Sequence, residues 1–100
     1  MPGIARITDS VSILHPTCSG VATCDVGSGT VFANGLSVHR VSDENTSHTY
    51  SPPSCPSHST PLTSGSPSVF VNGLPVGRVG DTYSCGAQIV TGSPSVFSGG

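Results

Sequence analysis

Residues 65–81 read Gly-Ser-Pro-Ser-Val-Phe-Val-Asn-Gly-Leu-Pro-Val-Gly-Arg-Val-Gly-Asp, and the chain repeats this stretch. Residues 27–43 read Gly-Ser-Gly-Thr-Val-Phe-Ala-Asn-Gly-Leu-Ser-Val-His-Arg-Val-Ser-Asp, which matches it position for position. A third version is divided between the ends, where residues 92–100 read Gly-Ser-Pro-Ser-Val-Phe-Ser-Gly-Gly and residues 1–9 read Met-Pro-Gly-Ile-Ala-Arg-Ile-Thr-Asp. We call residues 27–43 the first copy, residues 65–81 the second copy, and the two terminal pieces together the split copy.

Three copies of one unit predict pseudo-threefold symmetry. A repeat of this length cannot bury a hydrophobic face alone and must pack against its copies. Because the split copy is divided between the termini, the first and last segments of the chain should pair. The copies should therefore close around an axis instead of stacking into an open solenoid.

Each copy has the pattern of a short strand, a tight turn and a second short strand. Asn-Gly at 34–35 and again at 72–73 lies between β-branched and aromatic residues, which is a strong hairpin signal. Ser98-Gly99-Gly100 is a weaker equivalent in the split copy. With 13 Gly and 9 Pro in 100 residues, helix is disfavoured. We predict a single all-β domain over residues 1–100, with three pseudo-threefold hairpins, long loops and almost no helix.

The charge balance argues against a nucleic-acid partner. The chain has a net charge of -2, and its cations are three Arg with no Lys, so a phosphate-binding surface lacks the charge it needs. No apolar run is long enough for a signal peptide or a membrane span. We expect a soluble product that is made in the cytoplasm.

The loops that follow the copies carry candidate metal ligands. His15, His48 and Cys85 follow the Arg of their copies by nine, eight and seven residues, so the repeat brings them towards one axis. The longest loop adds His58, which can fold back over the same point. Imidazole and thiolate groups bind Zn²⁺ or Fe²⁺, and four of them make a closed tetrahedral site. We predict one structural metal ion, zinc or alternatively iron, held by His15, His48, His58 and Cys85.

Other roles for the cysteines stay open. Cys55 is the alternative ligand in place of His48, and Cys18 lies close enough to His15 to be considered. Four Cys could also form two disulfides, of which Cys18 to Cys24 would close a short loop. A reducing compartment disfavours that alternative. Cys24 is interpreted as a spare thiol.

Two further features of the copies are interpreted as structural. His39 occupies the position of Ala5 and Gly77, and we expect it to be structural or exposed. Each copy also contains an Arg followed three residues later by an Asp, which can hold the following loop through hydrogen bonds. These pairs are Arg6 with Asp9, Arg40 with Asp43, and Arg78 with Asp81.

The opening Met-Pro-Gly-Ile-Ala-Arg and the recurring Gly-Ser-Pro-Ser-Val-Phe-Val-Asn-Gly-Leu-Pro-Val-Gly-Arg-Val-Gly-Asp resemble the PAAR-repeat family over essentially the whole chain. The split repeat, Ser84-Cys-Gly86 and the closing Gly-Ser-x-x-Val-Phe at 92–97 carry this resemblance. The motif after which the family is named departs from its pattern, because only its Arg occurs in all three copies. Ser42 also replaces the Gly found at position 80.

The resemblance implies a sharp cone on the end of the trimeric β-helical spike of a contractile injection machine, such as a phage tail or a type VI secretion system. It also implies one metal ion near the apex, bound by three His and one Cys. One copy per trimer would cap the spike, touch the target outer membrane transiently and help to pierce it. The expected spike-binding residues are Val31, Phe32, Val69, Phe70, Val96 and Phe97.

Because the copies fill residues 1–100, no effector domain is expected, and the protein would assemble into a virion tail baseplate or a secretion apparatus. A type VI secretion tip that helps to carry separate effectors is the alternative. A free metal-binding or redox module is less favoured. A metalloenzyme is a further rival, but it needs an open coordination position in a cleft, and we expect no enzyme.

Overall fold

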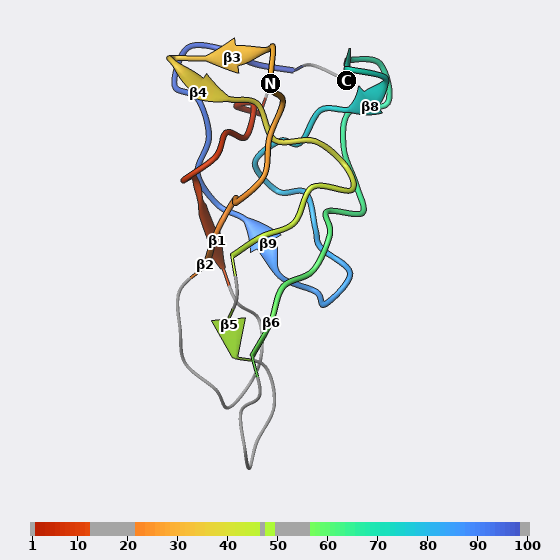
Figure 1. The fold of residues 1–100 in the computed structure, drawn as a ribbon. Coiled ribbons are helices and arrows are strands. Elements are labelled where there is room, and N and C mark those ends of the chain that lie inside the picture. The colour runs from red at the N-terminus through yellow and green to blue at the C-terminus, as the bar shows by residue number, and fades with distance from the viewer. Residues whose placement is uncertain (1, 13–21, 47, 50–56, 99–100) are drawn as a thin grey trace.

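The computed structural model describes residues 2–12, 22–46, 48–49 and 57–98, and they form a body of short antiparallel strands (Figure 1). The strands are β1 (Ser10–Ser12), β2 (Ala22–Thr23), β3 (Phe32–Ala33), β4 (Leu36–Ser37), β5 (His48–Thr49), β6 (Ser57–His58), β7 (Phe70–Val71), β8 (Leu74–Pro75) and β9 (Gln88–Ile89). The described residues contain no helix, and hence none that could cross a membrane. The predicted all-β class is confirmed.

Two of the predicted hairpins are present as predicted. β3 pairs with β4 and β7 pairs with β8, each antiparallel across an Asn-Gly turn. The φ angles are 53° at Asn34 and 79° at Gly35, and 54° at Asn72 and 80° at Gly73. Positive φ at both central residues is the type I′ geometry, whose twist matches that of the flanking strands. Asn and Gly are the residues that adopt it at least cost.

The two ends of the chain pair and complete the split copy. Gly3 and Phe97 form an antiparallel bridge, and Ile4 N donates to Val96 O over 2.9 Å. Ser98 N donates to Pro2 O over 3.1 Å. The predicted pairing of the terminal segments is therefore confirmed, and Figure 1 shows both ends at the same end of the molecule.

The three copies close into a ring of backbone hydrogen bonds. The residue before each Arg donates its N–H to the equivalent carbonyl of another copy: Ala5 N to Gly77 O at 2.9 Å, His39 N to Ala5 O at 2.9 Å, and Gly77 N to His39 O at 2.8 Å. These three hydrogen bonds form a closed triangle. It is the direct structural form of the pseudo-threefold symmetry in the sequence.

A second ring, whose donors lie two residues further along each copy, repeats this cyclic pattern. Its three bonds run from Ile7 N to Ser37 O, from Val41 N to Pro75 O, and from Val79 N to Gly3 O. A closed ring leaves none of its own strand edges available for pairing with another chain. The rings therefore give a chain of very short strands a defined centre.

Two clusters of buried apolar residues form the core of the described residues. The cluster beneath the hairpins consists of Ile4, Ala33, Val38, Val71 and Val76. The cluster in the body consists of Ala5, Val11, Ala22, Cys24, Leu62, Tyr83, Ala87 and Ile89. The sheet with the strand order β2-β1-β9 contributes to the second cluster.

The molecule is elongated, with extents of 40 × 24 × 21 Å. Figure 1 shows β3, β4 and β8 at one end, which we call the broad end, and β5 and β6 towards the other. The sheet of β1, β2 and β9 lies between them. This arrangement agrees with a small β cone, and it sets the hairpins of the copies far from the strands that carry His48 and His58.

Candidate metal centre and docking face

Each Arg and Asp of a copy form a clamp with the same geometry. In the first copy, Asp43 Oδ2 accepts from Arg40 N at 2.9 Å and from Arg40 Nε at 2.8 Å, while Asp43 Oδ1 accepts from Arg40 Nη2 at 3.0 Å. Bidentate pairing of this kind is among the stronger hydrogen-bond arrangements. It raises the pKa of Arg40, chiefly through the side-chain hydrogen bond to Asp43.

The other two clamps repeat these contacts. Arg6 N, Nε and Nη2 donate to the Asp9 carboxylate, and Arg78 N, Nε and Nη2 donate to the Asp81 carboxylate. The residue before each Asp has a positive φ, of 74° at Thr8, 81° at Ser42 and 97° at Gly80. The carboxylate thus holds a turn that is strained for a non-glycine residue. The structural interpretation of these pairs is supported.

The hairpin asparagines join one copy to another. Asn72 Oδ1 of the second copy accepts from Arg40 Nη1 at 3.1 Å and from the Ser28 hydroxyl of the first copy. Asn34 Oδ1 of the first copy accepts in the same way from Arg6 and Ser93 of the split copy. The Asn-Gly pattern predicts the turn, but it does not show what the Asn side chain contacts.

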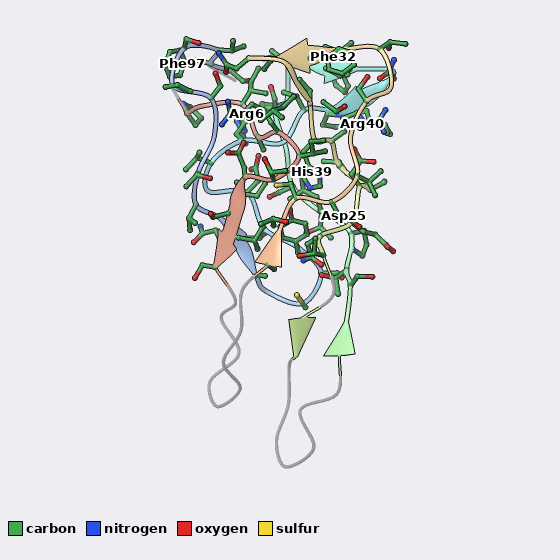
Figure 2. All side chains as sticks on the ribbon, turned by 60° about the vertical axis from the view of Figure 1, so that its left-hand side comes forward. Arg6, Asp25, Phe32, His39, Arg40 and Phe97 are labelled. Carbon is green, nitrogen blue, oxygen red and sulfur yellow. The ribbon has the colours of Figure 1, made fainter. Side chains whose placement is uncertain are left out.

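Three equivalent pairs of apolar side chains lie exposed at the hairpins, and we call them the docking face: Val31, Phe32, Val69, Phe70, Val96 and Phe97. The exposed fractions of the three Phe residues are 57% at Phe32, 56% at Phe70 and 46% at Phe97. The residue after each Phe is buried, so the strand alternation turns the Phe outward. Figure 2 shows Phe32 and Phe97 at the broad end and His39 inside the body.

The structure places three of the four predicted metal ligands in one region. His48 in β5 and His58 in β6 are direct cross-strand partners, a register that separates Cα atoms by about 4.5–5.5 Å. Cys85 is half-buried, and its Sγ accepts a hydrogen bond of 3.1 Å from the hydroxyl of Thr60, two residues after His58. His15, Cys18 and Cys55 lie outside the described residues.

The β5–β6 hairpin was not predicted. Two-residue strands without apolar alternation leave no strand signal in the sequence. Within the described ranges, no group of three or more His, Cys, Asp or Glu side chains is placed to hold a metal ion, and neither Cys24 nor Cys85 is in a disulfide. The ligand set of His15, His48, His58 and Cys85 stays a prediction.

A buried polar chain runs through the body from His39 to Cys24. His39 is fully buried, its Nδ1 lies 2.6 Å from Val26 O, and its Nε2 lies 2.8 Å from the Tyr83 hydroxyl. Because a carbonyl can only accept, Nδ1 carries the proton and Nε2 accepts from Tyr83. The Tyr83 oxygen in turn accepts from the Cys24 thiol at 3.5 Å. His39 is therefore structural, as expected, and it is not exposed.

Burial sets the protonation of this chain. Desolvation raises the pKa of Cys24 to about 12, and it also raises the pKa of Tyr83. Desolvation lowers the pKa of His39, against the opposing effects of the Val26 carbonyl, Asp43 and Asp25, while Arg40 adds to the lowering. All three groups are neutral near pH 7. The repeat does not predict this row of hydrogen-bonded side chains, since the equivalents of Tyr83 in the other copies are Asn45 and Val11.

Acid should destabilise the fold through His39. The pKa of His39 is lower in the folded chain than in the unfolded chain, where it is about 6.5. Below pH 6.5 the unfolded chain therefore binds more protons than the folded chain, and the free energy of unfolding decreases as the pH falls from about 6.5. One proton contributes a slope of up to about 1.4 kcal/mol per pH unit. Urea unfolding between pH 7.5 and 5 should give a steeper slope for the wild type than for His39→Gln, in which the other His residues are unchanged. Equal slopes would show that His39 takes no part.

The comparisons with known proteins agree with the repeats. The model of the PAAR motif family matches residues 52–100, a segment that contains the second copy, Cys85 and the C-terminal piece of the split copy. The curated proteins contain no match to the chain. Over residues 52–100 the chain therefore carries a PAAR motif, in agreement with the resemblance of its three copies to the PAAR-repeat family.

Proposed function

We propose that this protein is the tip of the trimeric β-helical spike of a contractile injection machine, that it caps and sharpens the spike, and that it helps to pierce the target envelope. The role is mechanical and not catalytic. The observation that carries the proposal is the docking face, a set of exposed apolar side chains that occurs three times around a closed ring. The PAAR motif at residues 52–100 supports the same role.

The symmetry of the docking face suits a trimeric partner. A single chain with three equivalent Val-Phe pairs can present one pair to each chain of a threefold spike. The end of a β-helix has open strand edges, and a cap that covers them removes a site of unwanted pairing. One copy per trimer follows, because a second copy would find no free face.

The exposed aromatic residues supply the chemistry of the contact. Three Phe side chains that are each about half exposed form an apolar surface of the kind that marks protein interfaces. The charged groups beside the face are already satisfied, since Arg6 and Arg40 pair with their Asp partners and with the hairpin Asn residues. Docking therefore buries apolar area without leaving these charges unpaired.

The opposite end of the molecule is the proposed metal site. Imidazole nitrogen and thiolate sulfur suit zinc or iron in a closed tetrahedral site. The pairing of His48 with His58, and the hydroxyl of Thr60 that approaches Cys85, are compatible with such a metal site. The metal would tie together loops that follow all three copies, with His15, His48, His58 and Cys85 as ligands, or Cys55 in place of His48. Its role would be to stiffen the apex under load.

Two variants distinguish the spike-tip proposal from the alternative functions. Phe70→Asp puts a charge into the docking face, and we expect at least about a hundredfold weaker binding to the purified spike trimer, because a buried aromatic anchor is lost and a carboxylate is desolvated. Val90→Asp is the matched control, because Val90 is 47% exposed and lies beside β9, away from the face. Titration by light scattering or calorimetry measures both.

The stoichiometry expected for the wild type is one chain per trimer. Equal binding by Phe70→Asp and the wild type would reject the docking face. A wild type that ignores the spike altogether would instead favour a free metal-binding module. Retention of binding by Phe70→Asp together with its loss in Val90→Asp would place the contact on the side of the body.

A further inference from the structure

Beside the proposed metal site, Thr60 connects Cys85 to a completely buried amide. Its hydroxyl lies 3.1 Å from Cys85 Sγ, and Asn45, which is 0% exposed, holds it from the other side. Thr60 N donates to Asn45 Oδ1 over 2.9 Å, and Asn45 N donates to Thr60 O over 3.1 Å. Asn45 Nδ2 also contacts Thr60 Oγ1, at 3.2 Å. The threonine is therefore fixed at three of its polar atoms.

These contacts determine which way the hydroxyl proton points. A backbone N–H can only donate, so the Asn45 atom that faces Thr60 N is its carbonyl oxygen. The amide nitrogen of Asn45 therefore faces Thr60 Oγ1 and donates to it. A hydroxyl has one proton, and with Asn45 acting as donor that proton is directed to Cys85 Sγ. The sulfur is thus held as an acceptor.

The position of Asn45 suggests that this arrangement serves more than packing. Its equivalents in the other two copies are Val11 and Tyr83, both of which lie in the apolar core of the body. A buried amide costs free energy unless all its polar atoms are bonded, and an apolar residue fills the same position elsewhere. Only the copy whose loop carries His48 and His58 places an amide there.

We propose that Asn45 and Thr60 are positioning residues of the metal site, which present a fixed hydroxyl donor to Cys85 and hold its sulfur ready for the metal. Hydrogen bonds of this kind to a metal ligand hold it in the orientation that the metal needs. The inference rests on the proposed metal site. It adds a role for two residues that are not themselves ligands.

The test compares zinc affinity at one fixed pH by competition with a chromophoric chelator. Thr60→Val removes the hydroxyl at nearly constant volume and should weaken zinc binding about 10- to 100-fold. Thr60→Ser keeps the hydroxyl and should restore most of the affinity. Thr63→Val is the control, because Thr63 is exposed and its hydroxyl bonds the Thr82 carbonyl instead of sulfur. It should bind zinc as the wild type does.

A second measurement reports on the sulfur itself. In the protein loaded with cobalt(II), the sulfur-to-metal charge-transfer absorption should move to longer wavelength in Thr60→Val, because the sulfur electrons lose a stabilising donor, and should return in Thr60→Ser. If Thr60→Val does not fold by circular dichroism, Thr60→Ala takes its place in both measurements. Unchanged affinity and an unchanged band would overturn the proposal and leave the hydrogen bond as packing.

Failure of the metal site and failure of this inference give different results. A wild type that binds neither zinc nor cobalt rejects the metal site, and the positioning role with it. A wild type that binds zinc as tightly as Cys85→Ser does would keep a metal site but show that Cys85 is no ligand. That result overturns the positioning role alone.

Discussion

Asp43→Ala is expected to lower the free energy of unfolding by about 3–5 kcal/mol, a large part of the stability of a small domain. The Asp43 carboxylate is nearly buried and accepts three hydrogen bonds from Arg40, one of them from its backbone N–H. Its removal leaves a poorly solvated guanidinium and an unpaired N–H beside the positive φ of Ser42. Urea unfolding of the wild type and the variant measures the difference.

Two comparisons decide whether the clamp is the cause. Asp25→Ala removes an exposed carboxylate, marked in Figure 2, and should change the stability by less than about 0.5 kcal/mol. Asp9→Ala and Asp81→Ala break the equivalent clamps and should each cost about as much as Asp43→Ala. A cost for Asp43→Ala no larger than that for Asp25→Ala would mean that the clamps do not hold the fold.

The repeat made much of the fold predictable. The division of one copy between the ends predicted the pairing that is observed between Gly3 and Phe97, and Asn-Gly predicted the turns at 34–35 and 72–73. These features are local, or follow from symmetry alone. The spacing of Arg and Asp was likewise enough to predict the clamps, because three residues across a turn bring the two groups together.

The centre of the ring was not predictable in the same way. Alignment puts Ala5, His39 and Gly77 at one position, but it does not show that their backbones form a triangle around the axis. A Cβ on Gly77 would lie 2.8 Å from a Leu62 methyl group, so the crowding leaves His39 as the one large side chain of the three. Its partner Tyr83 comes from a part of the chain where the copies no longer resemble one another.

The candidate site was predictable in residue type but not in its supports. His48 and Cys85 were singled out by their distance from the Arg of their copies, and His58 by its place in the longest loop. Asn45 and Thr60 carry no signal of their own. Their role depends on the bridge between Glu44 and Pro61, which brings the two sides of the longest loop together. Such a pairing depends on tertiary contacts that no repeat specifies.

Removal of the metal is expected to lower the stability by about 4 kcal/mol, relative to protein in zinc at a thousand times its dissociation constant. The strands nearest the proposed site, β5 and β6, are two residues long each and contribute little stability alone. Binding free energy at such a site becomes folding free energy. Elemental analysis should give one metal ion per chain, and thermal unfolding with and without chelator should show the loss.

Two variants separate the metal from other effects of the chelator. His58→Ala removes a proposed ligand, so it should unfold at the lower temperature whether or not chelator is present. Cys24→Ala removes a thiol that bonds Tyr83 inside the core and is not a proposed ligand, so it should keep the full response to chelator. A wild type that carries no metal and is unaffected by chelator would exclude the site. Among the described residues, the hydrogen bonds of Asn45 with Thr60 would then be contacts that hold this part of the fold without a metal.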